Sequence, residues 1–145
     1  MRRIHWKWIV LAAFLAEVSV FAIFFLLLFA ATAAGHPGIA RPMGTLDYID
    51  ALVSSFVSVF LFTLWAGKRI DSGFVMHGVL IGVFGTLLFA IIWIAATGSL
   101  AQPPLYVVAH GLKILGGVAG GLVAGKRRRQ ALPDKAFEAS INPVR

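Results

Sequence analysis

WKWIVLAAFLAEVSVFAIFFLLLFAATAA, residues 6–34, is an apolar run whose only charged residues are Lys7 and Glu17. A helix needs about 20 apolar residues to cross a bilayer, whereas the apolar region of a signal peptide has only about 7–15. The run exceeds both lengths, so it predicts an uncleaved membrane-spanning helix that tilts or protrudes from the bilayer. Trp6 and Trp8 fit the aromatic belt at the membrane interface, beside Lys7.

Three further apolar runs follow, and together with the first they indicate the fold class. They cover about residues 47–66, 74–96 and 105–125. Short segments rich in Gly and Pro separate the runs, and no such segment is long enough for a separate domain. We therefore predict an all-α protein, a four-helix transmembrane bundle of up-down topology. Its single membrane domain covers residues 1–129, and a polar cytoplasmic tail covers residues 130–145.

The composition of the whole chain supports a membrane protein. Of its 145 residues, 59% are apolar and 13% are charged, and the mean hydropathy is +0.88. A soluble domain is about half apolar and about a quarter charged, so a soluble fold could not bury this much apolar surface. Cysteine is absent, which excludes disulfides, thiolate metal sites and a cysteine nucleophile.

The net charge of +7 is grouped at the ends of the apolar runs. Lys and Arg gather near the N-terminus, at residues 68–69 and from residue 126 onward, whereas the predicted outer loops carry only Arg41. Loops rich in Lys and Arg stay on the cytoplasmic side of a membrane. We therefore expect both termini in the cytoplasm (N-in/C-in).

A basic cluster follows directly on the fourth apolar run. It consists of Lys126, Arg127, Arg128 and Arg129. Such a cluster attracts anionic lipid headgroups, with roughly 1 kcal/mol per charge near the surface, and it also fixes the topology. These two roles account for the cluster, so we expect membrane lipids as partners and no nucleic acid.

Two opposite charges lie near the middle of predicted spans. A helix rises ~1.5 Å per residue, which places Glu17 roughly 16 Å beyond Trp6 and Lys113 roughly 18 Å from Gly125. The first and last helices of a simple up-down bundle are neighbours, so we expect the two side chains to pair. Such a pair fixes helix register and orientation. One alternative is a proton relay or ion path, and another is no direct contact, with Glu17 neutral in lipid or in a dimer interface.

His110 lies three residues before Lys113, hence on nearly the same helix face. Glu17, His110 and Lys113 thus form a candidate intramembrane polar cluster. His110 could pass protons towards the outside, or it could simply hydrogen-bond a neighbouring helix. His77 lies at a different depth from His110, so the two cannot share a metal ion. We expect no metal site, no cofactor and no catalytic residues.

Glycines four residues apart mark the third and fourth apolar runs. Residues at this spacing share one helix face, where small side chains let another helix backbone approach closely. The set that we expect to serve helix packing is Gly78, Gly82, Gly117, Gly121 and Gly125. Their contacts are either internal to one subunit or part of a homo-oligomer or a larger membrane complex.

Several short motifs give the chain a resemblance to a known kind of protein. They are Trp6-Lys7-Trp8, the basic exit at residues 65–69, His77-Gly78, and Ala109-His110-Gly111-Leu112-Lys113 followed by paired glycines. With these motifs, residues 4–129 resemble small bacterial four-span integral membrane proteins of unassigned activity. The resemblance implies the fold and a location in the bacterial inner (cytoplasmic) membrane, and it supplies no catalytic residues.

Two functional hypotheses follow. The first is a non-enzymatic membrane protein with a packing, assembly or accessory role, which associates through its glycine-rich helices. The alternative is a small transporter, or a proton- or ion-conducting subunit, that uses Glu17, His110 and Lys113. An intramembrane enzyme ranks below both, because no convergent catalytic set is present in the sequence.

Overall fold

The computed structural model describes residues 4–35 and 48–141, with the backbone alone for residues 131–141. All elements in the described ranges are helices: α1 (Trp6–Ala33), the short π-helix η1 (Asp50–Ser54), α3 (Ser55–Gly67), α4 (Phe74–Thr97) and α5 (Pro104–Ile141). η1 and α3 are continuous and form one helical segment. With that segment taken together, four helices are long and apolar enough to cross a membrane.

The helix bounds agree with the predicted spans except at the end of the fourth. α1 and α4 end within a residue of the predicted positions, and the predicted start at residue 47 lies outside the described residues. α5 does not end near residue 125 but continues as one helix to Ile141. Lys, Arg, Gln and Ala favour helix, so the chain stays helical after its apolar part ends.

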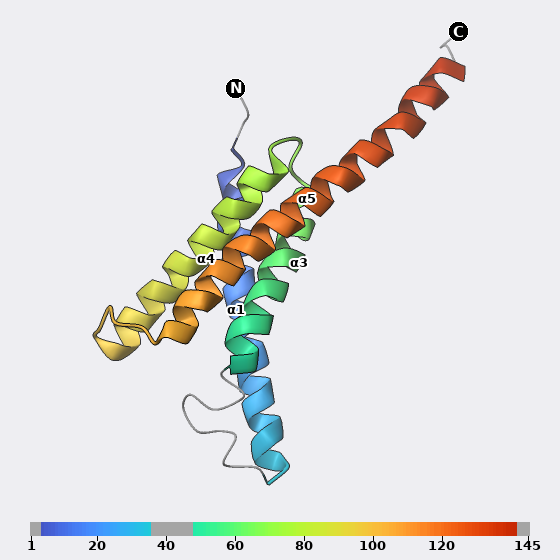
Figure 1. Ribbon diagram of the computed structural model, residues 1–145. Helices are drawn as coiled ribbons and strands as arrows, with labels where there is room; N and C mark the ends of the chain where they lie inside the picture. The colour runs from blue at the N-terminus through green and yellow to red at the C-terminus, as the bar shows by residue number, and fades with distance from the viewer. Residues whose placement is uncertain (1–3, 36–47, 142–145) are drawn as a thin grey trace.

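The order of the helices around the bundle differs from the one assumed for a simple up-down bundle. α5 packs along both α3 and α4, and α1 packs along the same two helices. α1 and α5 therefore lie diagonally opposite each other, with α5 (orange) in front and α1 (blue) behind in Figure 1. The expectation that the first and last helices are neighbours is thus wrong.

Two adjacent glycine faces on α5 explain this order. A Cβ on Gly117 would overlap the carbonyl oxygen of Gly78 in α4, and one on Gly121 would lie 2.6 Å from another backbone oxygen of α4. On the neighbouring face, a Cβ on Gly116 would lie 2.6 Å from a backbone oxygen of α3. Because α5 holds α3 and α4 this closely on both faces, α1 can pack only on their far side.

The remaining predicted packing glycines lie in the same contact between α4 and α5. A Cβ on Gly82 would lie 2.8 Å from Cα of Ile114, and one on Gly125 would lie 3.3 Å from the ring of Phe74. Gly111 is different, because a Cβ there would have nothing within 4 Å. The glycine set named from the sequence therefore packs helices within one chain.

One end of the bundle, here called the basic end, is formed by the start of α1, residues 68–74 and the basic stretch of α5. The backbone N–H of His5 donates to Nε2 of His77 over 3.1 Å, which joins α1 to α4. Arg128 of α5 lies 3.3 Å from the Asp71 carboxylate. Small and aliphatic side chains of α1, α3 and α4 pack tightly inside this half of the bundle.

At the opposite end, here called the far end, the bundle opens. Figure 1 shows α1 and α3 running to one tip while α4 and α5 run to another. The far end contains residues 20–33 of α1, η1, the end of α4 and the start of α5. There Trp93 of α4 donates to the carbonyl oxygen of Ala101 over 3.1 Å, which fixes the turn between α4 and α5.

Candidate functional site

Glu17 of α1 and Lys113 of α5 form an ion pair inside the bundle. Lys113 Nζ lies 2.7 Å from Oε1 and 2.8 Å from Oε2 of Glu17, and it donates a hydrogen bond to Oε2. Glu17 is 2% exposed and Lys113 is 1% exposed. The predicted contact between the two side chains is confirmed. Each charge compensates the other, as buried charges require.

The pair crosses the diagonal of the bundle because small residues of α3 and α4 leave space for it. A Cβ on Gly85 would lie 2.8 Å from Oε1 of Glu17, and one on Gly82 would lie 2.9 Å from the carbonyl oxygen of Lys113. On the α3 side, the buried Ser55 lines the same cavity as Lys113. The long lysine side chain can therefore reach the carboxylate between α3 and α4.

Gly85 has a role that its spacing does not reveal. It stands three residues after Gly82, outside the four-residue series, and it accommodates a side chain instead of a helix backbone. Any larger residue at this position would displace the Glu17 carboxylate. The presence of a third glycine in α4 was the only sequence signal for this role.

Phe89 of α4 lies between the ion pair and His110. Lys113 Nζ lies 4.8 Å from the centre of the Phe89 ring, and the His110 ring meets the same ring edge-on with 5.3 Å between centres. His110 Nε2 donates to Oε1 of Gln102 over 2.8 Å. The candidate polar cluster is thus divided: Glu17 and Lys113 pair, whereas His110 binds the turn that precedes α5.

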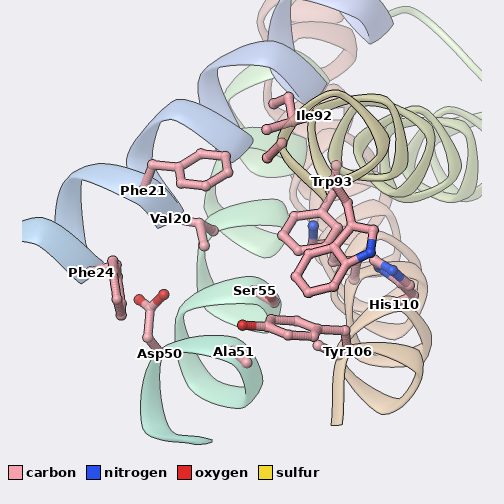
Figure 2. A pocket seen from close by; sticks show the side chains of 14 residues that line it. Val20, Phe21, Phe24, Asp50, Ala51, Ser55, Ile92, Trp93, Tyr106 and His110 are labelled. Carbon is pink, nitrogen blue, oxygen red and sulfur yellow. The ribbon is translucent and has the colours of Figure 1, made fainter. Parts of the chain in front are cut away.

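A cavity of about 190 Å³ lies next to the ion pair, on the side of the far end (Figure 2). All four spans contribute to its wall. Its polar side chains are Asp50, Ser55, Tyr106, His110 and Lys113, and its remaining residues are Val20, Phe21, Phe24, Ala51, Phe89, Ile92, Trp93, Ala96 and Ala109. The cavity thus combines charged groups with apolar and aromatic walls between the four apolar helices.

Asp50 is the charged residue of this cavity that the sequence analysis did not name. It begins η1, it is 6% exposed, and its side chain lines the cavity. In the sequence it falls in the first turn of a span. The helix dipole stabilises a carboxylate there, so the sequence alone does not indicate a functional role for it. A π-helix is rare and often marks a functional position. This π-helix and the tertiary contacts turn Asp50 towards the interior.

Between the ion pair and the basic end, the bundle is filled. Ala13, Ala16, Val59 and Ile81 are completely buried there. His77 belongs to this closed half: its Nδ1 donates to the carbonyl oxygen of Gly73 over 2.9 Å while its Nε2 accepts from His5. His77 therefore holds the start of α1 on α4. Two further pockets lie at the basic end, one between the start of α4 and α5 and the other between the end of α3 and α5.

Comparison with known proteins does not indicate a function for the chain. No protein-family model matches the chain, and no curated protein and no solved structure is similar to it. Across residues 4–35 and 48–130, no three His, Asp or Glu side chains are grouped so that they could hold a metal ion. Function therefore has to be inferred from the ion pair and the cavity.

Proposed function

We propose that the protein is a non-enzymatic integral membrane protein that binds a small solute between its helices, as a small transporter does. The observation that carries this proposal is the cavity between the four spans, whose lining residues include Asp50, His110 and Lys113. Ionisable residues that face a cavity within a membrane mark substrate or ion pathways. Spaces between the helices of a bundle are common ligand sites.

Assembly through the glycine-rich helices has less support. The glycines of α4 and α5 contact each other's backbone, so a second subunit could use them only by separating these two helices. Conduction of protons or ions past Glu17 and Lys113 also has less support, because the pair is closed on itself and tight packing lies behind it. Solute binding in the cavity requires neither separation of α4 from α5 nor opening of the Glu17–Lys113 pair.

The bundle geometry supports a simple form of alternating access. α1 and α3 meet α4 and α5 tightly at the basic end and diverge from them at the far end, so the cavity is closed towards the basic end. The Glu17–Lys113 pair joins the two helix pairs at the level where they begin to diverge. Rocking of one helix pair against the other around this level would expose the cavity to the opposite side.

The proposal includes an up-down topology with N-in/C-in orientation in the bacterial inner membrane. The basic end carries the exposed cluster of Lys126 to Arg129, which would face the cytoplasm and contact anionic lipid headgroups. The far end, which bears the cavity, would then face the outside.

Single cysteines test the orientation, and the cysteine-free chain needs no background removal. Ser72→Cys lies in an exposed turn at the basic end, and Leu100→Cys replaces a 79% exposed residue at the far end. In spheroplasts, a membrane-impermeant maleimide should label Leu100→Cys, and it should label Ser72→Cys only after permeabilisation. The reverse pattern would show that the basic end is outside.

Cysteines inside the bundle test whether the cavity admits solutes. Ala51 lines the cavity, whereas Ala13 is fully buried in the closed half and serves as the matched control. A small charged methanethiosulfonate added from the outside should modify Ala51→Cys at least about tenfold faster than Ala13→Cys, because only an exposed thiol ionises and reacts readily. Equal resistance of both cysteines would refute solute binding in the cavity.

A further inference from the structure

The ionisable side chains in the cavity wall already have partners within the protein. Lys113 is paired with Glu17, at 2.7 and 2.8 Å from the two carboxylate oxygens. Asp50 also has an interaction partner, and its negative charge acts favourably on the Lys113 ammonium. His110 Nε2 is hydrogen-bonded to Gln102 over 2.8 Å. A charged ligand would have to break one of these interactions or enter without a counter-charge, and either change is costly in a buried site.

Most of the remaining wall is aliphatic or aromatic. Phe89, Trp93 and Tyr106 form one group of rings, with 5.3 to 6.3 Å between ring centres. The indole N–H of Trp93 is bound to a backbone carbonyl and Tyr106 also has an interaction partner, so both rings offer mainly their apolar surface. In Figure 2, Phe21 and Phe24 lie on one side of the cavity while Trp93 and Tyr106 lie on the other. Such rings pack favourably against a further ring in edge-on or offset contact.

The exposed lining residues show where the cavity opens. Ile92 and Ala96 of α4 line the cavity, and both are exposed on the outside of the bundle, Ile92 by 44%. On other sides the wall is closed, since Ala51 of η1 and Ala109 of α5 pack together in a buried cluster and α1 packs along η1. The group of rings closes the side between α4 and α5. The cavity therefore opens sideways, between α1 and α4.

This opening lies within the apolar length of the spans. Ile92 is roughly 8 Å from the end of α4 at Thr97, because a helix rises ~1.5 Å per residue. The next residues along both helices are also apolar and exposed, with Phe25 of α1 62% exposed and Ile91 of α4 64% exposed. In a membrane the opening would face lipid chains, and the lipid phase admits neutral apolar molecules far more readily than charged ones.

The size of the cavity matches one aromatic ring. Its volume is about 190 Å³, and an apolar cavity of roughly 150 Å³ holds a benzene molecule. The space thus suits a single ring that carries a small substituent.

We infer that the cavity binds a small neutral aromatic molecule, a single ring with at most a small substituent, which enters from the lipid phase between α1 and α4. The inference rests on the proposed function and names its class of solute. The ring would pack between the aromatic side chains of α1 and those of α4 and α5, and the ionisable groups would keep their present partners.

Bromobenzene binding to the full chain in detergent micelles tests the inference. Replacement of Trp6, Trp8 and Trp65 by Phe leaves Trp93, which lines the cavity, as the single tryptophan. A bromine atom quenches tryptophan fluorescence on contact, so binding in the cavity should give saturable quenching. The dissociation constant for bromobenzene should be at least about tenfold lower than those for 4-bromobenzoate and 4-bromobenzylammonium, which carry the same ring with a negative or a positive charge.

A second reporter separates binding in the cavity from partition into the micelle. In this chain Trp6, Trp8 and Trp93 are replaced by Phe, so that Trp65, which packs on the core of the closed half, is the single tryptophan. Bromobenzene dissolved in the micelle should quench Trp65 only in proportion to its concentration. Saturable quenching of Trp65 with the same dissociation constant as for Trp93 would place the bound ring outside the cavity and overturn the inference.

Two variants of the Trp93 reporter test the opening between α1 and α4. Ala96→Phe places a ring at an exposed lining position and should weaken bromobenzene binding at least about tenfold by filling the opening. Ala95→Phe adds the same ring at an exposed position that does not line the cavity, and it should leave the affinity within about threefold. Purely proportional quenching of Trp93, equal or tighter binding of a charged ring, or equal affinities for the two variants would overturn the inference.

The two proposals can fail separately. If a charged ring binds in place of bromobenzene, solute binding stands and the neutral class of solute falls. If Ala51→Cys reacts with the reagent from the outside but none of the three rings binds, the cavity admits solutes and the aromatic class falls. If the cavity cysteine is inaccessible and no ring binds, both proposals fall.

Discussion

Glu17→Gln is expected to lower the free energy of unfolding by about 3–5 kcal/mol, the range typical for a broken buried ion pair. The substitution removes the carboxylate that contacts the Lys113 ammonium, in a residue that is only 1% exposed. The Phe89 ring remains at 4.8 Å from the ammonium nitrogen, but it cannot replace a carboxylate in contact with it. Titration of the purified protein with SDS in mixed micelles, followed by tryptophan fluorescence, measures the change.

The double substitution Glu17→Gln with Lys113→Met supplies the control. It removes both charges and retains side chains of similar size, so most of the lost stability should return. Lys113→Met alone should be as harmful as Glu17→Gln, because it leaves the carboxylate buried beside Gly85. Purely additive effects of the two single substitutions would mean that the pair carries no coupling energy.

Gly117→Ala is expected to cost about 3 kcal/mol, the upper part of the range for overpacking. The added methyl group would overlap the carbonyl oxygen of Gly78, and neither backbone can turn aside as a side chain can. α4 and α5 would have to separate along their contact. The same SDS titration should show the loss as an earlier unfolding midpoint.

Gly111→Ala is the matched control on the same helix. A Cβ at Gly111 has nothing within 4 Å, so this substitution should be neutral or stabilise by up to about 1 kcal/mol through helix propensity. Equal midpoints for the two alanine variants would contradict the backbone contact. A change in oligomer size without loss of stability in Gly117→Leu would instead favour the assembly role.

Much of the fold could be predicted because its signals are local. Hydropathy and run length identify four spans, and α1 and α4 have nearly the expected bounds. The polar end of α5 is not predicted by hydropathy, because the end of an apolar run need not be the end of a helix, and residues 126–141 form a helix that does not depend on a bilayer.

The ion pair was predicted for a reason that was only half right. Counting residues correctly placed Glu17 and Lys113 at similar depth, since helix rise is constant. The assumed adjacency of their helices was wrong: the side chains meet across the diagonal, through space left by Gly82 and Gly85. His110 shares a face with Lys113 as expected, yet Phe89 and the hydrogen bond to Gln102 separate it from the pair.

By itself, the sequence determined four membrane-length helices, the glycine faces that pack them and the common depth of the two buried charges. These are properties of single helices, fixed by hydropathy, spacing and rise per residue. Only the tertiary structure decided that α1 and α5 lie on a diagonal, and that Asp50 and five aromatic side chains from different helices surround one cavity. That arrangement depends on how two adjacent glycine faces of α5 bind α3 and α4 at once, which no single helix encodes.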